Sequence, residues 1–318
     1  MSLMEDRFFS KSVARLLRVG IAAICVIFTS CSINRTAMKM VAGALSSGAV
    51  GSSFTGDDDP ELVGDALPFV LKLYESLLDT VKDNPGLYLA AGSGFIMYAN
   101  AYVQMPADML PDEAFEQKKQ MTDRARRLYL RGRDYVLQGF EAKYAGFMNA
   151  IDSGGYESFF SRMDKSDVPY LYWAAAGWMA AWAADPFDVE TGIGVKKAAM
   201  MMERALSLDE AWDEGSIHDF FILYYGSLPE SMGGSMEKAR RHFERALALS
   251  KGKRASPYVS LASTVSVKSQ NAAEFTDLLN KALAIDVSEK YPGRLVNIIA
   301  QRKARRLLER KGSLFLEH

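Results

Sequence analysis

Apolar residues recur every three to four positions through most of the chain, which predicts amphipathic helices rather than strands. Three of these stretches end in near copies of one motif: Arg204–Asp209 (RALSLD), Arg245–Ser250 (RALALS) and Lys281–Asp286 (KALAID). The copies begin 41 and 36 residues apart. Repeats of roughly 34–40 residues are typical of arrays built from helix pairs. The pattern therefore predicts a helical repeat, although a chance run of amphipathic helices with similar ends is the simpler alternative.

The helices that carry these motifs share a pattern of three contact residues on one face. The middle residue is bulky; it lies four positions after the first contact residue and three before the last. Small residues on either side of the bulky one let a neighbouring helix approach closely. The sets are Ala198, Met202 and Ala205; Ala239, Phe243 and Ala246; Phe275, Leu279 and Ala282; and, more weakly, Ala125, Tyr129 and Gly132. Partner helices are expected just before them, at Leu87–Gln104, Val168–Ala184, Ile217–Leu228 and Pro257–Ser269. We therefore expect an all-α fold over residues 61–318, a tetratricopeptide-like (TPR-like) solenoid of about four helix pairs with extra helices.

Two of the expected partner helices, Leu87–Gln104 and Val168–Ala184, carry no charged residue. By hydropathy alone each could be a membrane span. Both are rich in Ala and Gly rather than Leu, and the repeat supplies them with packing partners. Since a helix that is apolar all round is also typical of a protein interior, we expect both to be buried in the fold.

The N-terminus has the pattern of a secretory signal, with basic residues followed by the apolar run Val19–Phe28. The run Phe28–Cys31 resembles a bacterial lipobox, which predicts signal cleavage and acylation of Cys31 by palmitate-type chains. Residues 1–30 would then be a lipoprotein signal peptide, and residues 31–60 a lipidated N-terminus with a short helix and a Gly/Ser/Asp-rich tether. A secreted protein with an incidental cysteine is the alternative. With acylation, we expect a periplasmic protein anchored to a lipid bilayer through Cys31.

Composition and charge exclude several functions. The chain is 49% hydrophobic and 24% charged with a formal net charge of −1, so a nucleic-acid partner is not expected. The three histidines share no metal-ligand spacing, and we expect neither a metal nor another cofactor. No nucleophile elbow or phosphate-binding loop occurs in the sequence, so we do not expect an enzyme.

Aromatic residues concentrate in the expected partner helices, which line the concave surface of TPR arrays. A ligand or partner groove built from them would be apolar with a few polar groups. The simpler interpretation is packing between repeats. The candidate groove residues are Tyr88, Phe95, Tyr98, Asn100, Tyr102, Tyr170, Trp173, Trp178, Trp182, Phe220 and Tyr224.

Basic residues cluster on two helices, between Arg124 and Arg133 and between Arg294 and Lys311. A solvated outer face and a polar cap on the last repeat are the ordinary interpretation. An acidic partner or anionic headgroups are the alternative.

The lipobox, the tether and the RAL-ended helix pairs, with the stretch Tyr170–Trp178 (YLYWAAAGW), together resemble the T component of TPR-associated TRAP transporters, a periplasmic lipoprotein. The resemblance covers nearly the whole mature chain. It implies a homotrimer, a cavity or pore through each protomer, and association with a TRAP-type substrate-binding protein that passes a ligand to a permease. The function expected from it is a lipid-anchored transport accessory that handles a small apolar ligand. The alternative is a TPR scaffold for cell-envelope assembly that binds no small molecule.

Overall fold

The computed structural model describes residues 41–43, 53–288 and 291–316. Within these ranges the ordered elements are helices, and no β-strand occurs among them. This confirms the all-α expectation for the described part of the chain. The expected signal peptide, Cys31 and residues 44–52 of the tether lie outside the described residues. No helix in the described ranges is long and apolar enough to cross a membrane.

The helices follow one another with short connections. The longer ones are α3 (Pro60–Thr80), α4 (Pro85–Ala99), α6 (Phe115–Lys143), α9 (Val168–Ala184), α10 (Val189–Leu208), α11 (Ser216–Ser227), α12 (Met236–Ser250), α14 (Ala272–Leu283) and α15 (Arg294–Glu309). The shorter ones are α5 (Met105–Met109), α7 (Phe147–Ser153), α8 (Glu157–Phe160), α13 (Ser256–Leu261) and α16 (Lys311–Leu314). π-helical turns extend α4 through Asn100–Gln104 and α13 through Ala262–Ser266. Four 3-10 turns also occur, at Asp112–Ala114, Lys165–Asp167, Trp212–Gly215 and Glu230–Met232, and residues 41–43 and 53–55 are helical.

Polar side chains fix where many of these helices begin. Asp59, Asn84, Asp188, Ser235 and Asn271 each precede a helix and accept a hydrogen bond from a backbone N–H in its first turn. Such a cap satisfies one of the N–H groups that a helix start leaves without a partner, and contributes about 1 kcal/mol. The caps therefore set the helix starts locally, before tertiary packing is considered.

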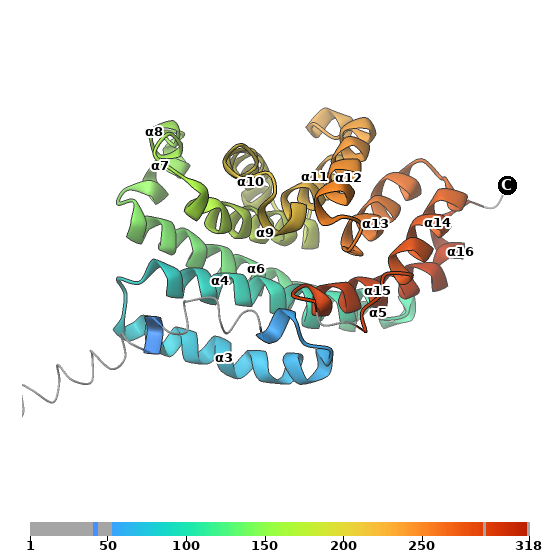
Figure 1. Ribbon diagram of the computed structural model, residues 1–318, viewed down its shortest axis with the longest axis horizontal. Helices are drawn as coiled ribbons and strands as arrows, with labels where there is room; N and C mark the ends of the chain where they lie inside the picture. Colours follow the sequence, from blue (N-terminus) through green and yellow to red (C-terminus); the bar gives the residue numbers. More distant parts are fainter. Residues whose placement is uncertain (1–40, 44–52, 289–290, 317–318) are drawn as a thin grey trace, which may run out of the picture.

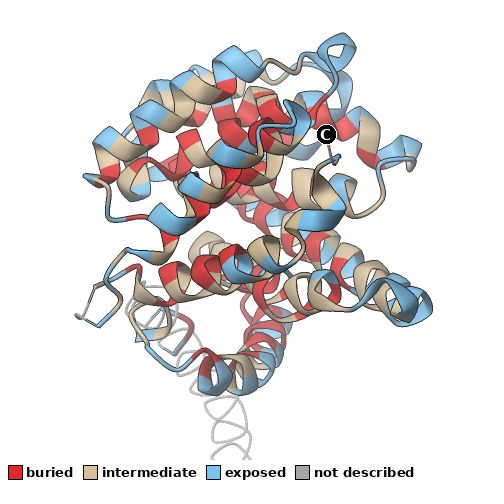
Figure 2. Ribbon diagram, turned by 90° about the vertical axis from the view of Figure 1, so that its right-hand side faces the viewer, coloured by how far each residue is buried: buried red, intermediate tan, exposed pale blue. Residues whose placement is uncertain are grey.

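Neighbouring helices pack in pairs in the expected order. α4 lies along α6, α9 lies along both α6 and α10, α11 lies along α12, and α13 lies along α14 (Figure 1). We call α4, α9, α11 and α13 the first helices and α6, α10, α12 and α14 the second helices of these pairs. The recurring contact positions of the second helices are buried, except Phe243, which is half-buried. Figure 2 shows that buried residues gather between the helices, whereas the exposed ones lie on the outer surface. The small and bulky positions seen in the sequence therefore do mark helix–helix contacts.

Glycine brings the backbones of α4 and α6 together. A Cβ atom added to Gly92 would lie 2.6 Å from the carbonyl oxygen of Gly132, and one added to Gly132 would lie equally close to the carbonyl of Gly92. Because backbone cannot move aside as a flexible side chain can, neither position tolerates a larger residue without separating the helices. Helix α9 joins the same crossing, because a Cβ atom added to Gly177 of α9 would lie 2.8 Å from the Ile96 side chain of α4.

The two ends of the described chain meet where α15 contacts α3 and approaches α5 (Figure 1). Only a few apolar residues are buried there, namely Val63, Leu67 and Leu295. Three ion pairs add to this small apolar cluster, and we call the whole contact the terminal seam: Arg302–Glu61 at 2.6 and 3.0 Å, Arg294–Asp58 at 3.0 Å and Arg310–Asp112 at 2.9 Å. The basic residues of the last helix thus largely pair within the chain.

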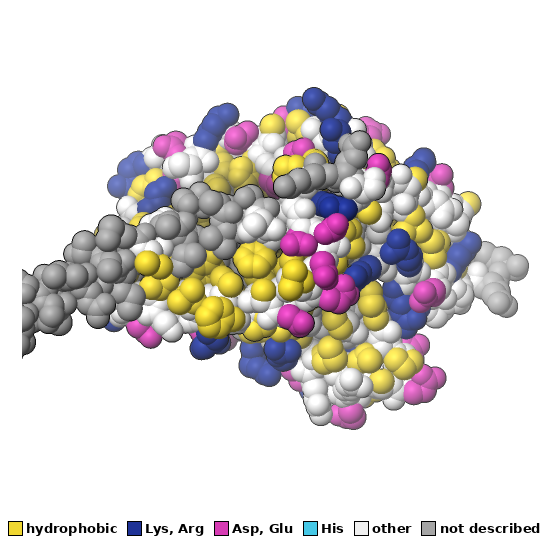
Figure 3. All heavy atoms as spheres, turned by 60° about the horizontal axis from the view of Figure 1, so that its bottom comes forward, with side chains coloured by type: hydrophobic (Ala, Val, Ile, Leu, Met, Phe, Trp, Pro, Cys, Tyr) yellow, Lys and Arg dark blue, Asp and Glu magenta, His cyan; other side chains and the backbone are white. Residues whose placement is uncertain are grey.

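The outer side of α3 is unusually apolar for a surface helix. Leu62 and Phe69 are exposed there, and Figure 3 shows hydrophobic side chains gathered on this face of the molecule. The opposite side of the same helix carries Leu71 and Leu77, which are buried against α4. α3 is therefore apolar on two sides, only one of which the described residues cover.

Candidate functional site

One stripe of residues on each first helix stays accessible after the helices have packed. On α9 the partly exposed positions include Tyr172, Ala176, Met179 and Ala183. Their spacing of four, three and four residues places them on a single side of the helix. We call the corresponding residues of the four first helices the open stripes: Leu89, Ser93, Met97, Asn100 and Gln104; Tyr172, Trp173, Ala176, Met179 and Ala183; Asp219, Leu223 and Ser227; and Ser256, Ser263 and Val267.

The open stripes mix apolar side chains with small polar ones, and Asp219 is the single carboxylate among them. Its Oδ1 atom is shielded from solvent and has no hydrogen-bond partner among the described residues. Burial raises the pKa of Asp219, while hydrogen bonds from Ser260 and Ser256 and the charge of Arg254 act in the opposite direction. A titratable group of this kind beside accessible apolar surface is typical of a binding site.

A strained turn holds the residues beside Asp219 in place. Asp213 and Glu214 have φ values of 44° and 54°, in the left-handed region that residues with a Cβ rarely adopt. The buried Arg254 compensates, because its guanidinium contacts Asp213 at 2.8 Å and lies 3.8 Å from Glu214. The same guanidinium donates to the hydroxyl of Ser216 at 2.5 Å, and that hydroxyl in turn donates to the Asp213 side chain at 2.6 Å. Backbone strain that the surrounding side chains hold in place clusters at functional sites.

Aromatic rings connect this turn to the open stripe of α9. The ring of Trp212 packs on Tyr172 with centroids 4.6 Å apart, and Tyr172 packs edge-on against Trp173 at 5.2 Å. Burial is the main cause that raises the pKa of Tyr172, so its hydroxyl stays protonated and available as a donor. The three rings form a half-buried aromatic group at the middle of the chain.

Four of the aromatic residues expected in a groove are buried between helices: Phe95, Tyr170, Trp178 and Phe220. Phe95 stacks on a tyrosine of α6 with centroids 5.8 Å apart, and Tyr170 packs on a phenylalanine of the same helix at 5.3 Å. Two cations lie over the ring of Trp178, with Cζ of Arg133 at 4.8 Å and Nζ of Lys197 at 5.6 Å from its centroid. These four side chains contribute to packing between neighbouring helices.

The other expected residues are partly or fully exposed and fall into separate groups. Tyr98 and Tyr102 stack on each other at 5.7 Å close to the terminal seam. Asn100 donates to the hydroxyl of Tyr129 at 3.4 Å. The remaining members are placed as follows: Tyr88 packs beside α6, Trp173 lies on the open stripe of α9, Trp182 approaches Gly192, and Tyr224 stacks on Phe220.

The structure thus brings Trp173 and Asn100 onto the open stripes and distributes the other candidates among several interfaces. Sequence reasoning missed the group formed by Tyr172, Trp212, Asp219 and Arg254. Asp219 carried a signal, because it is the one acid in an otherwise aromatic helix. In the described ranges no group of three or more His, Cys, Asp or Glu side chains is placed to hold a metal ion.

Comparison with known proteins identifies the family. The family model for the TRAP transporter T-component matches residues 56–315. An uncharacterized protein of Treponema pallidum (strain Nichols) is 35% identical over 310 residues, which cover 93% of this chain and 96% of that protein. The family is one of transporter accessories and is not a known class of enzymes. The chain therefore belongs to the TRAP transporter T-component family and has an accessory role in TRAP transport.

Proposed function

We propose that this protein is a periplasmic, lipid-anchored component that binds a TRAP-type substrate-binding protein and handles a small, largely apolar ligand along its open stripes. The observation that carries the proposal is the alignment of accessible residues on one side of each first helix, in a chain of the T-component family. The homotrimer implied by the family resemblance is part of the proposal.

The helix pairs support the protein-binding part. We propose that α4 with α6, α9 with α10, α11 with α12, and α13 with α14 are four divergent TPR units. In such arrays the first helices present a continuous surface to a partner, while the second helices pack behind them. The open stripes lie on the helices that this arrangement requires.

The chemistry of the open stripes supports the ligand part. Met97, Met179 and Leu223 offer adaptable apolar surface, and Tyr172 and Asp219 add a few polar groups. Sites for small molecules combine apolar walls with a small number of polar groups that fix orientation. A ligand with an extended apolar portion suits this surface better than a highly charged one.

The anchor is proposed from the sequence. Cys31→Ala should release the protein from the membrane fraction into the soluble envelope fraction, because removing the acyl chains removes the attachment. The matched control is Ser32→Ala, which leaves the cysteine intact. Equal membrane retention of both variants would contradict lipid anchoring.

The experiment that tests the partner is isolation of the full lipoprotein from its own cells in mild detergent, with co-purifying proteins identified by mass. We expect a periplasmic substrate-binding protein at near-equal stoichiometry. Trp173→Ala should weaken that complex or its ligand binding more than it lowers the melting temperature. Recovery of envelope-assembly proteins instead would favour the alternative, a TPR scaffold that binds no small molecule.

A further inference from the structure

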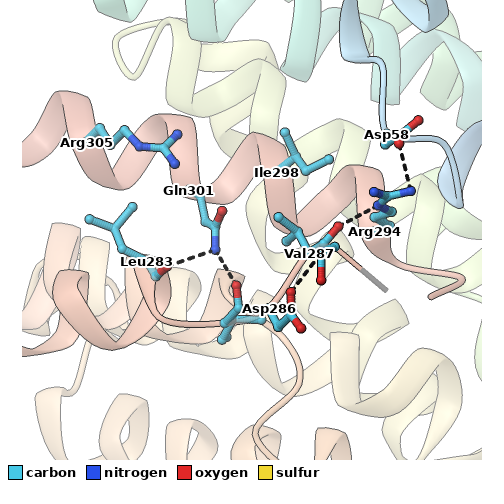
Figure 4. Close-up of a pocket in the computed structure, with 10 residues that line it drawn as sticks. Asp58, Leu283, Asp286, Val287, Arg294, Ile298, Gln301 and Arg305 are labelled. Carbon is cyan, nitrogen blue, oxygen red and sulfur yellow. Dashed lines mark hydrogen bonds and ion pairs between the residues drawn. The ribbon is translucent and has the colours of Figure 1, made fainter. Parts of the chain in front are cut away.

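A second candidate binding site lies at the far end of the repeat, away from the aromatic group of α9. It is an open hollow of about 520 Å³ between the end of α14, the loop that follows, α15, and Asp58 ahead of α3 (Figure 4). This volume is sufficient for a small organic molecule. The hollow is independent of the open stripes, since none of its lining residues belongs to them.

The floor of the hollow is apolar and firmly held. Leu283, Ile285 and Ile298 contribute partly buried aliphatic side chains. The amide nitrogen of the buried Gln301 donates to carbonyl groups at the end of α14 and just beyond it, those of Ala282, Leu283 and Ile285, at 3.1, 3.3 and 2.8 Å. Because this amide ties the end of α14 and the start of the following loop to α15, these segments form a preformed wall.

Two arginines border this floor, and they differ in whether their guanidinium groups are paired. Arg294 is fully engaged, since its Nε donates to the carbonyl of Val287 at 2.6 Å and its guanidinium pairs with Asp58 at 3.0 Å. Arg305 is exposed and makes no ion pair or side-chain hydrogen bond with the described residues. In Figure 4 it extends from α15 over the same side of the helix as Gln301.

The two carboxylates that line the hollow have partners other than Arg305. Asp58 pairs with Arg294, and Asp286 accepts a hydrogen bond from the backbone N–H of Ser288 at 2.8 Å. Hydrogen bonds from the Ser288 side chain and then from its backbone N–H, followed by the charge of Arg294, lower the pKa of Asp286, so its carboxyl remains ionised. In Figure 4 this carboxyl lies apart from Arg305. Arg305 is therefore the uncompensated donor at the edge of an aliphatic floor.

We propose that this hollow binds a small amphiphilic monocarboxylate, with its carboxylate on Arg305 and its aliphatic portion on Leu283 and Ile298. A planar guanidinium matches a carboxylate through two parallel hydrogen bonds, which a lysine or an uncharged side chain cannot reproduce. The aliphatic floor distinguishes such a ligand from a fully hydrated inorganic anion, which gains nothing from apolar contact.

The test is calorimetric titration of the full-length protein in a non-ionic detergent with hexanoate, hexylammonium and inorganic phosphate as probes. We expect saturable binding of hexanoate, and a dissociation constant at least about tenfold higher in Arg305→Gln, since the variant loses a charge-assisted pair. Ile298→Ser should weaken hexanoate binding as well. Arg241→Gln, an exposed arginine on α12, is the matched control and also accounts for partition of the probes into micelles.

Three results would overturn the proposal: no saturable hexanoate binding, equal affinity in Arg305→Gln and the control, or binding of hexylammonium or phosphate as tight as that of hexanoate. The proposed accessory function is tested separately. Recovery of the substrate-binding protein by Arg305→Gln would leave that function intact even if the hollow bound no carboxylate.

Discussion

The contact between α9 and α10 and the terminal seam join helices by opposite means. Between α9 and α10 the packing is apolar and close. Leu171 and Met201 are fully buried there, and the indole of Trp178 occupies the space left by the missing side chain of Gly194. At the terminal seam the apolar cluster is small, and three ion pairs contribute whose acidic partners, such as Glu61, are largely exposed.

These two regions respond differently to their surroundings. Apolar burial contributes about 25 cal/mol per Å² and depends little on salt. Exposed ion pairs contribute about 0–1 kcal/mol each and are screened within about 10 Å at moderate ionic strength. We therefore expect the contact between α9 and α10 to be the more rigid of the two, and the closure of α15 on α3 to be the one that solution conditions alter more easily.

The largest expected effect comes from filling the space between α9 and α10. A Cβ at Gly194 would lie 1.6 Å from Nε1 of Trp178, so Gly194→Leu must displace a buried indole. We expect a loss of about 3 kcal/mol or more of unfolding free energy, measured by denaturant titration. Gly192→Ala is the matched control, because its Cβ would meet Trp182 only at 3.9 Å. A stable Gly194→Leu protein would show that this contact is not the rigid one.

The next effect concerns the strained turn beside the central helices. Arg254→Met leaves Asp213 and Glu214 without the cation that holds them in left-handed conformations. We expect a loss of about 2 kcal/mol, less than for a fully buried pair because the Asp213 carboxylate is partly hydrated. Arg241→Met, which removes an exposed arginine, should cost little by the same thermal or denaturant measurement.

A smaller effect should appear on acidification. Burial, followed by the proximity of His218, lowers the pKa of His242 to about 4, and burial also lowers the pKa of His218. The two Nδ1 atoms are 2.8 Å apart. Both histidines bind protons more readily unfolded, so the native state should lose about 1 kcal/mol as the pH falls from about 6.5 toward 4. His242→Phe should reduce the dependence of the unfolding free energy on pH, measured by unfolding titrations at pH 7 and 5. An unchanged pH dependence would mean that other groups cause the loss.

The smallest effect on global stability is expected at the terminal seam. Glu61→Arg places like charges beside Arg302 and should cost less than about 1 kcal/mol, with the loss reduced at high salt. The double variant Glu61→Arg/Arg302→Glu restores opposite charges and should recover it. Hydrogen exchange of α3 provides the sharper measurement, because opening of the seam would expose that helix without unfolding the central ones. Exchange that is insensitive to both salt and charge would make the seam as rigid as the central helices.

Much of the fold follows from local patterns. Val168–Ala184 forms a helix with the predicted bounds, and Ala198, Met202 and Ala205 are buried as their spacing predicts. Such positions are readable because helix periodicity and neighbour packing act over short stretches of chain. The partner helix expected at Leu87–Gln104 is likewise found, although its last turn has π-helical hydrogen bonding.

The closure and the candidate site depend on information that short patterns do not contain. Whether Arg302 meets solvent or Glu61 is decided by the cumulative curvature of all the helices between them. Similarly, Trp178 and Trp173 are five positions apart on one helix, yet one is buried against cations and the other is partly exposed on the open stripe. Aromatic content alone cannot distinguish these two environments.

The separation of the partners in the terminal seam has a consequence for how the molecule assembles. Glu61 and Arg302 are 241 positions apart. At a synthesis rate of about 5–20 residues per second, α15 emerges roughly 10–50 s after α3. During that interval Val63 and Leu67 lack the partner that later covers them. Closure is therefore expected as the last and slowest assembly step, and a chain interrupted before α15 would retain its packed centre while leaving α3 unprotected.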